Sequence, residues 1–309
     1  MERVLSGALD KYGSGGSTPT PACDGEQSQA GLWETDSAAP FHYPFSQEQF
    51  FRVRTLIYQE AGIALAPGKR DMVYSRLARR VRARQLDSFG QYLELVEGGD
   101  QEELEAFINA LTTNMTSFFR EPHHFQILAQ QLAQHRGGRP VAIWCCAAST
   151  GEEPYSIAMT AVDALGSFAP SLRILATDID TSVLAKGKLG VYPEDQLQKI
   201  PPRQLKRFFL KGQGKNEGSA RVRDELRQLV CFKRLNLLDQ QWPMRGKFDF
   251  IFCRNVMIYF DKKTQHAILE KIAERLKPGG LLFVGHSESF HNTQDQFRIC
   301  GNTVYALKE

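Results

Sequence analysis

The chain has 309 residues, of which 24% are charged, and a formal net charge of only +3 at pH 7. This small net charge gives no general reason to expect a nucleic-acid partner, so any basic patch has to be judged locally. No run of about 18 apolar residues occurs and the N-terminus lacks the features of a secretory signal, so we expect no membrane-spanning helix and no secretion. The six cysteines lie mostly in apolar runs without C-x-x-C spacing, which predicts reduced core residues in a cytoplasmic protein and no bound metal.

Residues 1–42 are predicted to form a disordered tail. Gly, Ser, Thr, Pro and Gln dominate residues 13–40, and this composition buries too little apolar surface to fold. Order is expected from about residue 43, and Ser46 has the features of a helix N-cap.

Residues 43–134 are predicted to form an all-helical N-terminal domain. Apolar residues recur at helical spacing, first from Phe50 to Ile57 and again from Met72 to Val81. A glycine-containing stretch at 134–140 is a plausible linker to the rest of the chain. Arginines flank the second apolar stripe, namely Arg70, Arg76, Arg79, Arg80, Arg82 and Arg84.

Residues 135–309 are predicted to form an α/β domain, because strand-like and helical segments alternate. The strand-like segments are 141–145, 173–176, 229–234, 248–253, 281–285 and 303–307, and the helical ones are 155–165, 182–187 and 263–276. This alternation predicts a mostly parallel sheet covered on both faces. Gly301-Asn302 is a hairpin signal that adds an antiparallel strand. Residues 192–230 interrupt the alternation and are either a small inserted β-subdomain or a connecting loop.

Residues 141–155 combine a buried strand, a turn of small residues and the acidic start of a helix. Such a turn lets a ligand approach the backbone at the carboxyl end of a strand. Only Gly151 of a G-x-G-x-x-G fingerprint is present, and Glu152 and Glu153 would repel a pyrophosphate. A nucleoside that carries positive charge and no phosphate, such as S-adenosylmethionine (SAM), suits the turn better. Alternatively, the two acids only complement the helix dipole.

Polar side chains end two further strands at the same edge of the predicted sheet. Asp178 can accept hydrogen bonds from ribose hydroxyls; as a helix N-cap, Asp180 is better placed than Asp178. Arg254 could pair with a carboxylate, and Asn255 could bind a ligand amide or amine. Tyr259 could reach the same site or pack in the core.

The end of the helical region carries a further group of candidate ligand residues. Asn114, Thr116 and Arg120 lie beside two aromatic residues and could hold a ligand, or they could form a helix cap. His123 and His124 have no cysteine nearby to complete a metal site, so packing or surface roles are favoured. No nucleophile elbow, P-loop or H-E-x-x-H helix occurs, which leaves hydrolase and kinase functions with little support.

From about residue 45 to its end, the sequence resembles the bacterial chemotaxis receptor methyltransferases, which are SAM-dependent protein-glutamate O-methyltransferases. The matching stretches are 69–74, 113–121, 148–156, 176–180, 253–260 and 285–289. The resemblance implies an all-helical N-terminal domain followed by a Rossmann-like class I SAM methyltransferase domain with a small β-subdomain insertion.

The resemblance also assigns roles to individual residues. It implies that SAM is contacted by Asn114, Thr116, Arg120, Glu153, Asp178, Asn236, Leu237, Arg254 and Asn255, with Asp178 at the ribose and Asn236 and Leu237 beside the adenine. It implies catalytic roles for Arg120, Arg254 and Tyr259 near the transferred methyl group and the incoming glutamate, with S-adenosyl-L-homocysteine as product.

The implied partners are the cytoplasmic domains of methyl-accepting chemotaxis receptors, so contact with a membrane would come only through them. The basic face with Arg70, Arg76, Arg79, Arg80 and Arg82 would attract acidic receptor helices. The loop with Gly212, Gly214 and Gly218 resembles that of members that grip a peptide at the receptor C-terminus. In the tail, Trp33-Glu34-Thr35 resembles the core of that peptide: it either occupies the protein's own peptide site or is a chance match, and we favour chance because short matches are common.

Three other functions stay open on sequence alone. They are a SAM enzyme that acts on nucleic acid or a small molecule, a catalytically silent receptor-binding module, and an NAD-dependent oxidoreductase. The missing glycine fingerprint weakens the oxidoreductase.

Overall fold

The computed structural model describes residues 43–134, 139–288 and 296–308. The predicted disordered tail at 1–42, with its Trp33-Glu34-Thr35 segment, and most of the predicted linker lie outside the described residues. Among the described helices, none is both long enough and apolar enough to cross a membrane.

The helical part consists of four α-helices and one short 3-10 helix that share a core. They are α1 (Gln47–Ala61), η1 (Pro67–Lys69), α2 (Arg70–Ala83), α3 (Phe89–Glu97) and α4 (Gln101–Leu111). Ser46 is the N-cap of α1, as predicted: its side chain accepts a hydrogen bond from Gln49 N, and the Gln49 side chain accepts one from Ser46 N. Phe50, Ile57 and Leu77 are fully buried in this core, so both predicted apolar stripes face inward.

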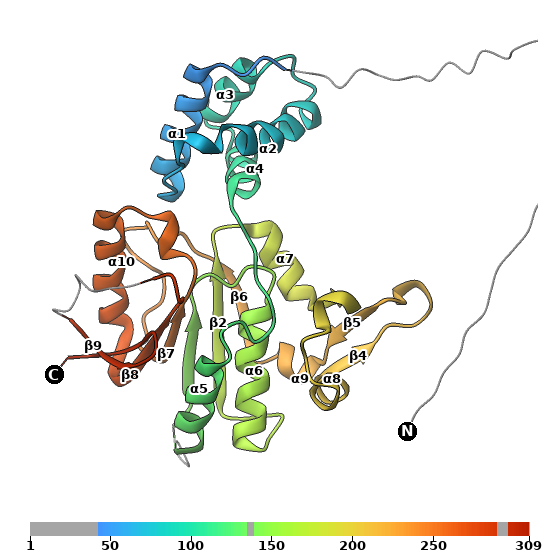
Figure 1. The fold of residues 1–309 in the computed structure, drawn as a ribbon, viewed down its shortest axis with the longest axis vertical. Helices are drawn as coiled ribbons and strands as arrows, with labels where there is room; N and C mark the ends of the chain where they lie inside the picture. Colours follow the sequence, from blue (N-terminus) through green and yellow to red (C-terminus); the bar gives the residue numbers. More distant parts are fainter. Residues whose placement is uncertain (1–42, 135–138, 289–295, 309) are drawn as a thin grey trace, which may run out of the picture. The chain divides into compact units, whose positions relative to one another are not determined.

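The predicted helical domain extends to residue 134, and its last segment packs differently from the helices before it. This segment forms α5 (His123–Gln134), which buries Leu128 and Leu132 in a core shared with the sheet and packs along α6 (Glu152–Leu165), as Figure 1 shows. Helical periodicity gives the apolar face of a helix but not the element that this face contacts. The helical part therefore ends with α4.

The main sheet has seven strands, and the prediction of a mostly parallel sheet is confirmed. The strands are β1 (Val141–Cys145), β2 (Leu172–Asp178), β6 (Val230–Arg234), β7 (Phe248–Cys253), β8 (Leu276–Val284), β9 (Phe297–Gly301) and β10 (Val304–Leu307). Their order is β6-β2-β1-β7-β8-β10-β9. The first five run parallel, β10 pairs with β8 in the antiparallel direction, and β9 pairs with β10 as an antiparallel hairpin, which confirms the predicted hairpin.

Helices cover both faces of the sheet, which explains why its central strands are apolar on both sides. All six residues of β7 are buried. Alternate residues of β1 enter different cores: Ile143 contributes to the core with α5 and α6, while Trp144 contributes to the core with α10 (Lys262–Arg275).

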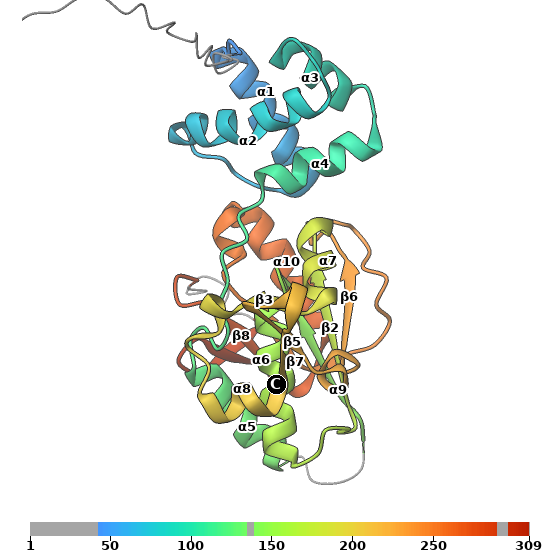
Figure 2. The ribbon, with the colours of Figure 1, turned by 90° about the vertical axis from the view of Figure 1, so that its right-hand side faces the viewer.

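A second, three-stranded antiparallel sheet occupies the predicted insertion. It follows α7 (Thr181–Leu189) and has the order β3-β5-β4; Figure 2 shows β3 and β5 beside α8 and α9. Its elements are β3 (Val191–Pro193), η2 (Glu194–Leu197), α8 (Pro202–Phe208), β4 (Phe209–Lys211), η3 (Gly214–Asn216), β5 (Ser219–Val222) and α9 (Asp224–Arg227).

The strand order creates a ligand-binding edge between β1 and β7. From β1 the chain builds outward through β2 to β6 on one side, and then returns to place β7 on the other side of β1. Ligands of open parallel sheets bind at the carboxyl ends of the strands where the order reverses in this way. The segments after β1, β2 and β7 meet at this edge.

Candidate functional site

A cavity of about 430 Å³ lies at this edge, and the helical part contributes to its wall. This volume is in the usual range of small-molecule sites. The structure brings to this one cavity every residue predicted to contact SAM or to act in catalysis. These residues are Asn114, Thr116, Arg120, Glu153, Asp178, Asn236, Leu237, Arg254, Asn255 and Tyr259. Their individual roles remain predictions.

The turn after β1 is shaped by close contacts that only small residues permit. Gly151 has φ +99°, and a Cβ atom there would lie 2.8 Å from the Tyr192 hydroxyl and 3.0 Å from Gly187 Cα. Ser149 also adopts a left-handed conformation, with φ +47°, and its N–H donates to Asp178 Oδ2 at 2.8 Å. The turn and the end of β2 therefore hold each other in place.

Asp178 is a buried carboxylate in the cavity wall. It is 8% exposed and accepts backbone hydrogen bonds from Ser149 and Asp180, one on each oxygen. Each oxygen keeps a lone pair for a ligand. Burial raises the pKa of Asp178, and the backbone donors offset part of this rise, so the resulting pKa is about 6. As expected, Asp180 is the N-cap of α7.

Arg254 lies between two carboxylates and is almost fully buried. Its guanidinium pairs with Glu153 through Nη1 and with Glu121 at 3.4 Å through Nη2. The same Nη2 donates to Arg120 O. Burial would raise the pKa of Glu121, but Arg254 and a backbone donor hold it below its usual value. Glu121 was not singled out from the sequence, although it belongs to a stretch that resembles the chemotaxis methyltransferases.

The side-chain amides of two predicted ligand residues are held by hydrogen bonds, and that of Asn236 connects the sheet to the helical part. Asn114 donates to Asp180 Oδ2 at 2.7 Å, and its carbonyl oxygen accepts from Ser149 Oγ. Asn236 donates to Glu60 O at 2.7 Å and accepts from Leu238 N. These side chains therefore fix the cavity wall as well as line it.

Comparison with known proteins identifies the family. The sequence model of the CheR methyltransferase SAM-binding domain matches residues 114–306, and that of the CheR all-alpha domain matches residues 48–112. The chain belongs to the CheR methyltransferase family. The boundary between the two matches agrees with an end of the helical part at α4.

Curated relatives within the CheR family are similar over most of their length. The chemotaxis protein methyltransferase of Salmonella typhimurium is 53% identical over 85% of this chain and 91% of its own length. The chemotaxis protein methyltransferase of Escherichia coli is 52% identical over 85% of this chain and 92% of its own length. Chemotaxis protein methyltransferase 2 of Pseudomonas aeruginosa is 52% identical over 86% of this chain and 94% of its own length.

The structure shows which arginines of the predicted basic face are exposed in this CheR-family protein. Three arginines of α2 make contacts inside the helical part. Arg70 donates to Phe45 O, Arg76 donates to Thr112 O at 2.6 Å, and Arg80 pairs with buried Glu103. Only Arg79 and Arg82 of the predicted set are exposed. The positions of the arginines beside the apolar stripe could not show which of them turn inward.

The glycines of the predicted peptide-binding loop lie between β4 and β5. Gly212 N donates to Ser219 O at 2.8 Å, and a Cβ atom on Gly212 would overlap Asn216 O. Gly214 and Gly218 both have positive φ. The loop thus needs glycine for its backbone path, while its binding role stays a prediction.

The cysteine prediction is partly wrong. Cys145, Cys146 and Cys253 are free and buried, as expected. Cys231 and Cys300 are exposed, because they lie in β6 and β9 at the two edges of the sheet. Cys23 lies outside the described residues.

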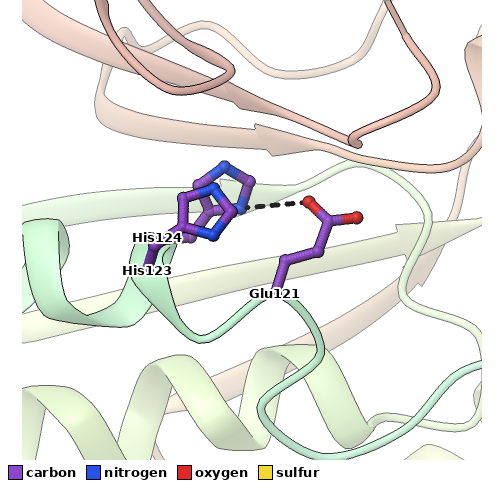
Figure 3. Close-up of side chains that lie close together, drawn as sticks. All are labelled: Glu121, His123 and His124. Carbon is purple, nitrogen blue, oxygen red and sulfur yellow. Dashed lines mark ion pairs between the residues drawn. The ribbon is translucent and has the colours of Figure 1, made fainter.

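Glu121, His123 and His124 lie close together at the start of α5 (Figure 3). Glu121 Oε2 is 3.7 Å from His124 Nδ1, and three potential metal-ligating atoms of the group lie within 4.8 Å of one another. Burial and the nearby Arg254 lower the pKa of His124 to about 3. Because the Arg254 guanidinium already pairs with Glu121, a divalent cation here would meet a fixed positive charge. The absence of metal ligands stays a prediction.

Proposed function

We propose that this CheR-family protein transfers the methyl group of SAM to glutamate side chains of chemotaxis receptors. The products would be glutamate γ-methyl esters and S-adenosyl-L-homocysteine. The observation that carries the proposal is the gathering of two carboxylates and two guanidinium groups around one cavity at the sheet's ligand edge. The CheR family match and the names of the relatives support it.

The cavity fits SAM in both charge and polarity. Glu153 and Asp178 supply negative charge toward a ligand that carries a sulfonium and an ammonium group. Ile63 and Leu237 supply apolar wall toward the adenine. When bound, SAM supplies a methyl group that a carboxylate nucleophile can accept.

The residues around the cavity can orient a substrate carboxylate without a strong base. A glutamate, with a pKa of about 4.3, is already ionised at neutral pH. Arg254 is engaged by Glu153 and Glu121, so we assign orientation of the substrate to Arg120, which lines the cavity and is partly exposed. Burial raises the pKa of Tyr259, so its phenol stays protonated and can donate a hydrogen bond. The rate acceleration would then come from positioning of the substrate carboxylate against the methyl group and from exclusion of water.

Receptor recognition is proposed to use two surfaces of the chain. The exposed Arg79 and Arg82 would attract acidic receptor helices. A C-terminal receptor peptide would add as a strand to an open edge of the β3-β5-β4 sheet. Such a tether would raise the local concentration of substrate. Under this proposal the protein works in the cytoplasm, meets the membrane only through receptors and binds no nucleic acid.

The test is incubation with radiolabelled SAM and receptor-containing membranes. We expect label on the receptors that mild base releases, because carboxyl methyl esters are labile and N-methyl groups are not. Base-stable label, or SAM binding without any label on receptors, would contradict the proposal.

SAM affinity is expected to depend on pH through Asp178. An aspartate with a pKa of about 6 is ionised above pH 6 and neutral below it, so bonds that need the carboxylate are lost as pH falls. Affinity should drop about tenfold from pH 7 to pH 5. Calorimetry at several pH values measures this. An Asp178→Asn variant should bind weakly at every pH, and a similar pH dependence in this variant would show that another group is responsible.

A further inference from the structure

The Glu288 carboxylate is buried among backbone N–H groups from two loops. Oε1 accepts from Val256 N at 2.8 Å and from Met257 N at 2.7 Å. Oε2 accepts from Asn255 N at 2.8 Å and from Gly285 N at 2.6 Å. Glu288 is only 4% exposed and is absent from the cavity lining. A buried charge is tolerated when hydrogen bonds satisfy it, and here each oxygen accepts two.

The backbone that Glu288 holds is strained and tightly fitted. Asn255 has φ +56°, in the left-handed region that residues other than glycine seldom adopt, although asparagine tolerates it better than most. Gly285 lies against it, since a Cβ atom there would be 2.8 Å from both Asn255 N and Glu288 Oε2. Strained backbone persists only where its surroundings hold it.

The held segment carries groups that line the cavity. Arg254 and Asn255 lie at its start, and Tyr259 lies at its end in the short helix η4 (Met257–Tyr259). Tyr259 O also accepts from Ala64 N at 2.8 Å, which ties the segment to the helical part. A shift of residues 255–257 would therefore move three groups of the site together.

We propose that Glu288 is a positioning residue: its carboxylate fixes the backbone of residues 255–257 and thereby places Arg254, Asn255 and Tyr259 around the cavity. For catalysis, the proposal rests on the function proposed above. Glu288 does not line the cavity and acts only through the segment that it holds.

The decisive variant is Glu288→Gln, with the exposed Glu274→Gln on α10 as the matched control. A glutamine keeps one acceptor oxygen, but its NH₂ group would face N–H donors and cannot accept from them. We expect SAM affinity to fall about tenfold and methyl transfer to fall about tenfold to a hundredfold, since misplacement of about 1 Å has effects of this size. Amide hydrogen exchange should become faster at residues 255–257 and stay slow in β7. The control should match the wild type.

Three outcomes would overturn the proposal. The first is unchanged amide exchange at residues 255–257. The second is faster exchange there with SAM affinity and turnover within twofold of wild type. The third is faster exchange throughout the sheet, which would mark Glu288 as a residue of general folding. If Glu288→Gln does not fold, Glu288→Asp keeps the charge on a shorter side chain, and the same criteria apply. SAM affinity and amide exchange need no receptor, so a failure of receptor methylation in the wild type would be separable from a failure of this proposal.

Discussion

Arg254→Ala is expected to lower the free energy of unfolding by about 3–5 kcal/mol, the range found when one partner of a buried ion pair is removed. Receptor methylation should fall at least about a hundredfold in the same variant, because Glu153 would lose the partner that fixes it at the cavity. Sequence analysis supports the loss of activity, while the loss of stability follows only from the burial of Arg254 between Glu153 and Glu121. Urea unfolding and methylation assays measure the two effects.

The double variant Arg254→Ala/Glu153→Gln separates these two effects. It removes one of the carboxylates left unpaired by Arg254→Ala, so part of the lost stability should return. Activity should not return, since both groups line the cavity. A single variant as stable as the wild type would show that the ion pairs contribute little, and wild-type turnover would remove Arg254 from the site.

Arg80→Ala and Arg79→Ala are expected to differ sharply although the two residues are neighbours on α2. Arg80 makes a bidentate pair with Glu103, which is fully buried, so its loss should lower the free energy of unfolding by about 3 kcal/mol. Arg84 also pairs with Glu103 and would still compensate its charge in this variant, which limits the loss of stability. Arg79 is exposed, and its loss should change stability by less than about 0.5 kcal/mol.

Arg79, which should contribute little to stability, is the residue that we expect to affect receptor binding. Arg79→Ala should raise KM for receptors and leave SAM affinity unchanged, because the exposed arginine is proposed to meet acidic receptor helices. Urea unfolding and receptor titrations measure both properties. Equal receptor KM in Arg79→Ala and wild type would exclude this arginine from receptor binding, and a stable Arg80→Ala would contradict the role given to its ion pair.

Much of the fold could be predicted because its signals are local. The strand β7 is a continuous apolar run, and the structure gives it the predicted bounds, Phe248–Cys253. The cavity residues could be grouped because the carboxyl ends of parallel strands meet at one edge. The β-insertion was visible only as an interruption, since three short strands carry little periodicity.

The features that could not be predicted depend on contacts between distant segments. The partner of α5 is a helix that begins 18 residues after α5 ends, and nothing in α5 itself identifies it. The inward turn of Arg80 depends on Glu103 in another helix. Glu288 belongs to the stretch 285–289 that resembles the chemotaxis methyltransferases. Its proposed role depends on backbone N–H donors about 30 residues earlier, and every residue type except proline has such a donor, so the sequence does not identify them.

The cavity wall built jointly by the helical part and the sheet has a consequence for engineering. Asn236 joins the sheet to the helical part by its hydrogen bond to Glu60 O, Thr112 at the end of α4 donates to Asp180 Oδ2, and both residues line the cavity. A chimera that exchanges residues 43–111 for those of a relative, made to redirect receptor choice, would also replace part of the methyl-donor site. Because the exchanged segment contributes Ile63, Lys69 and Met72 to the cavity, such hybrids should change the retention of the donor as well as the selectivity for receptors.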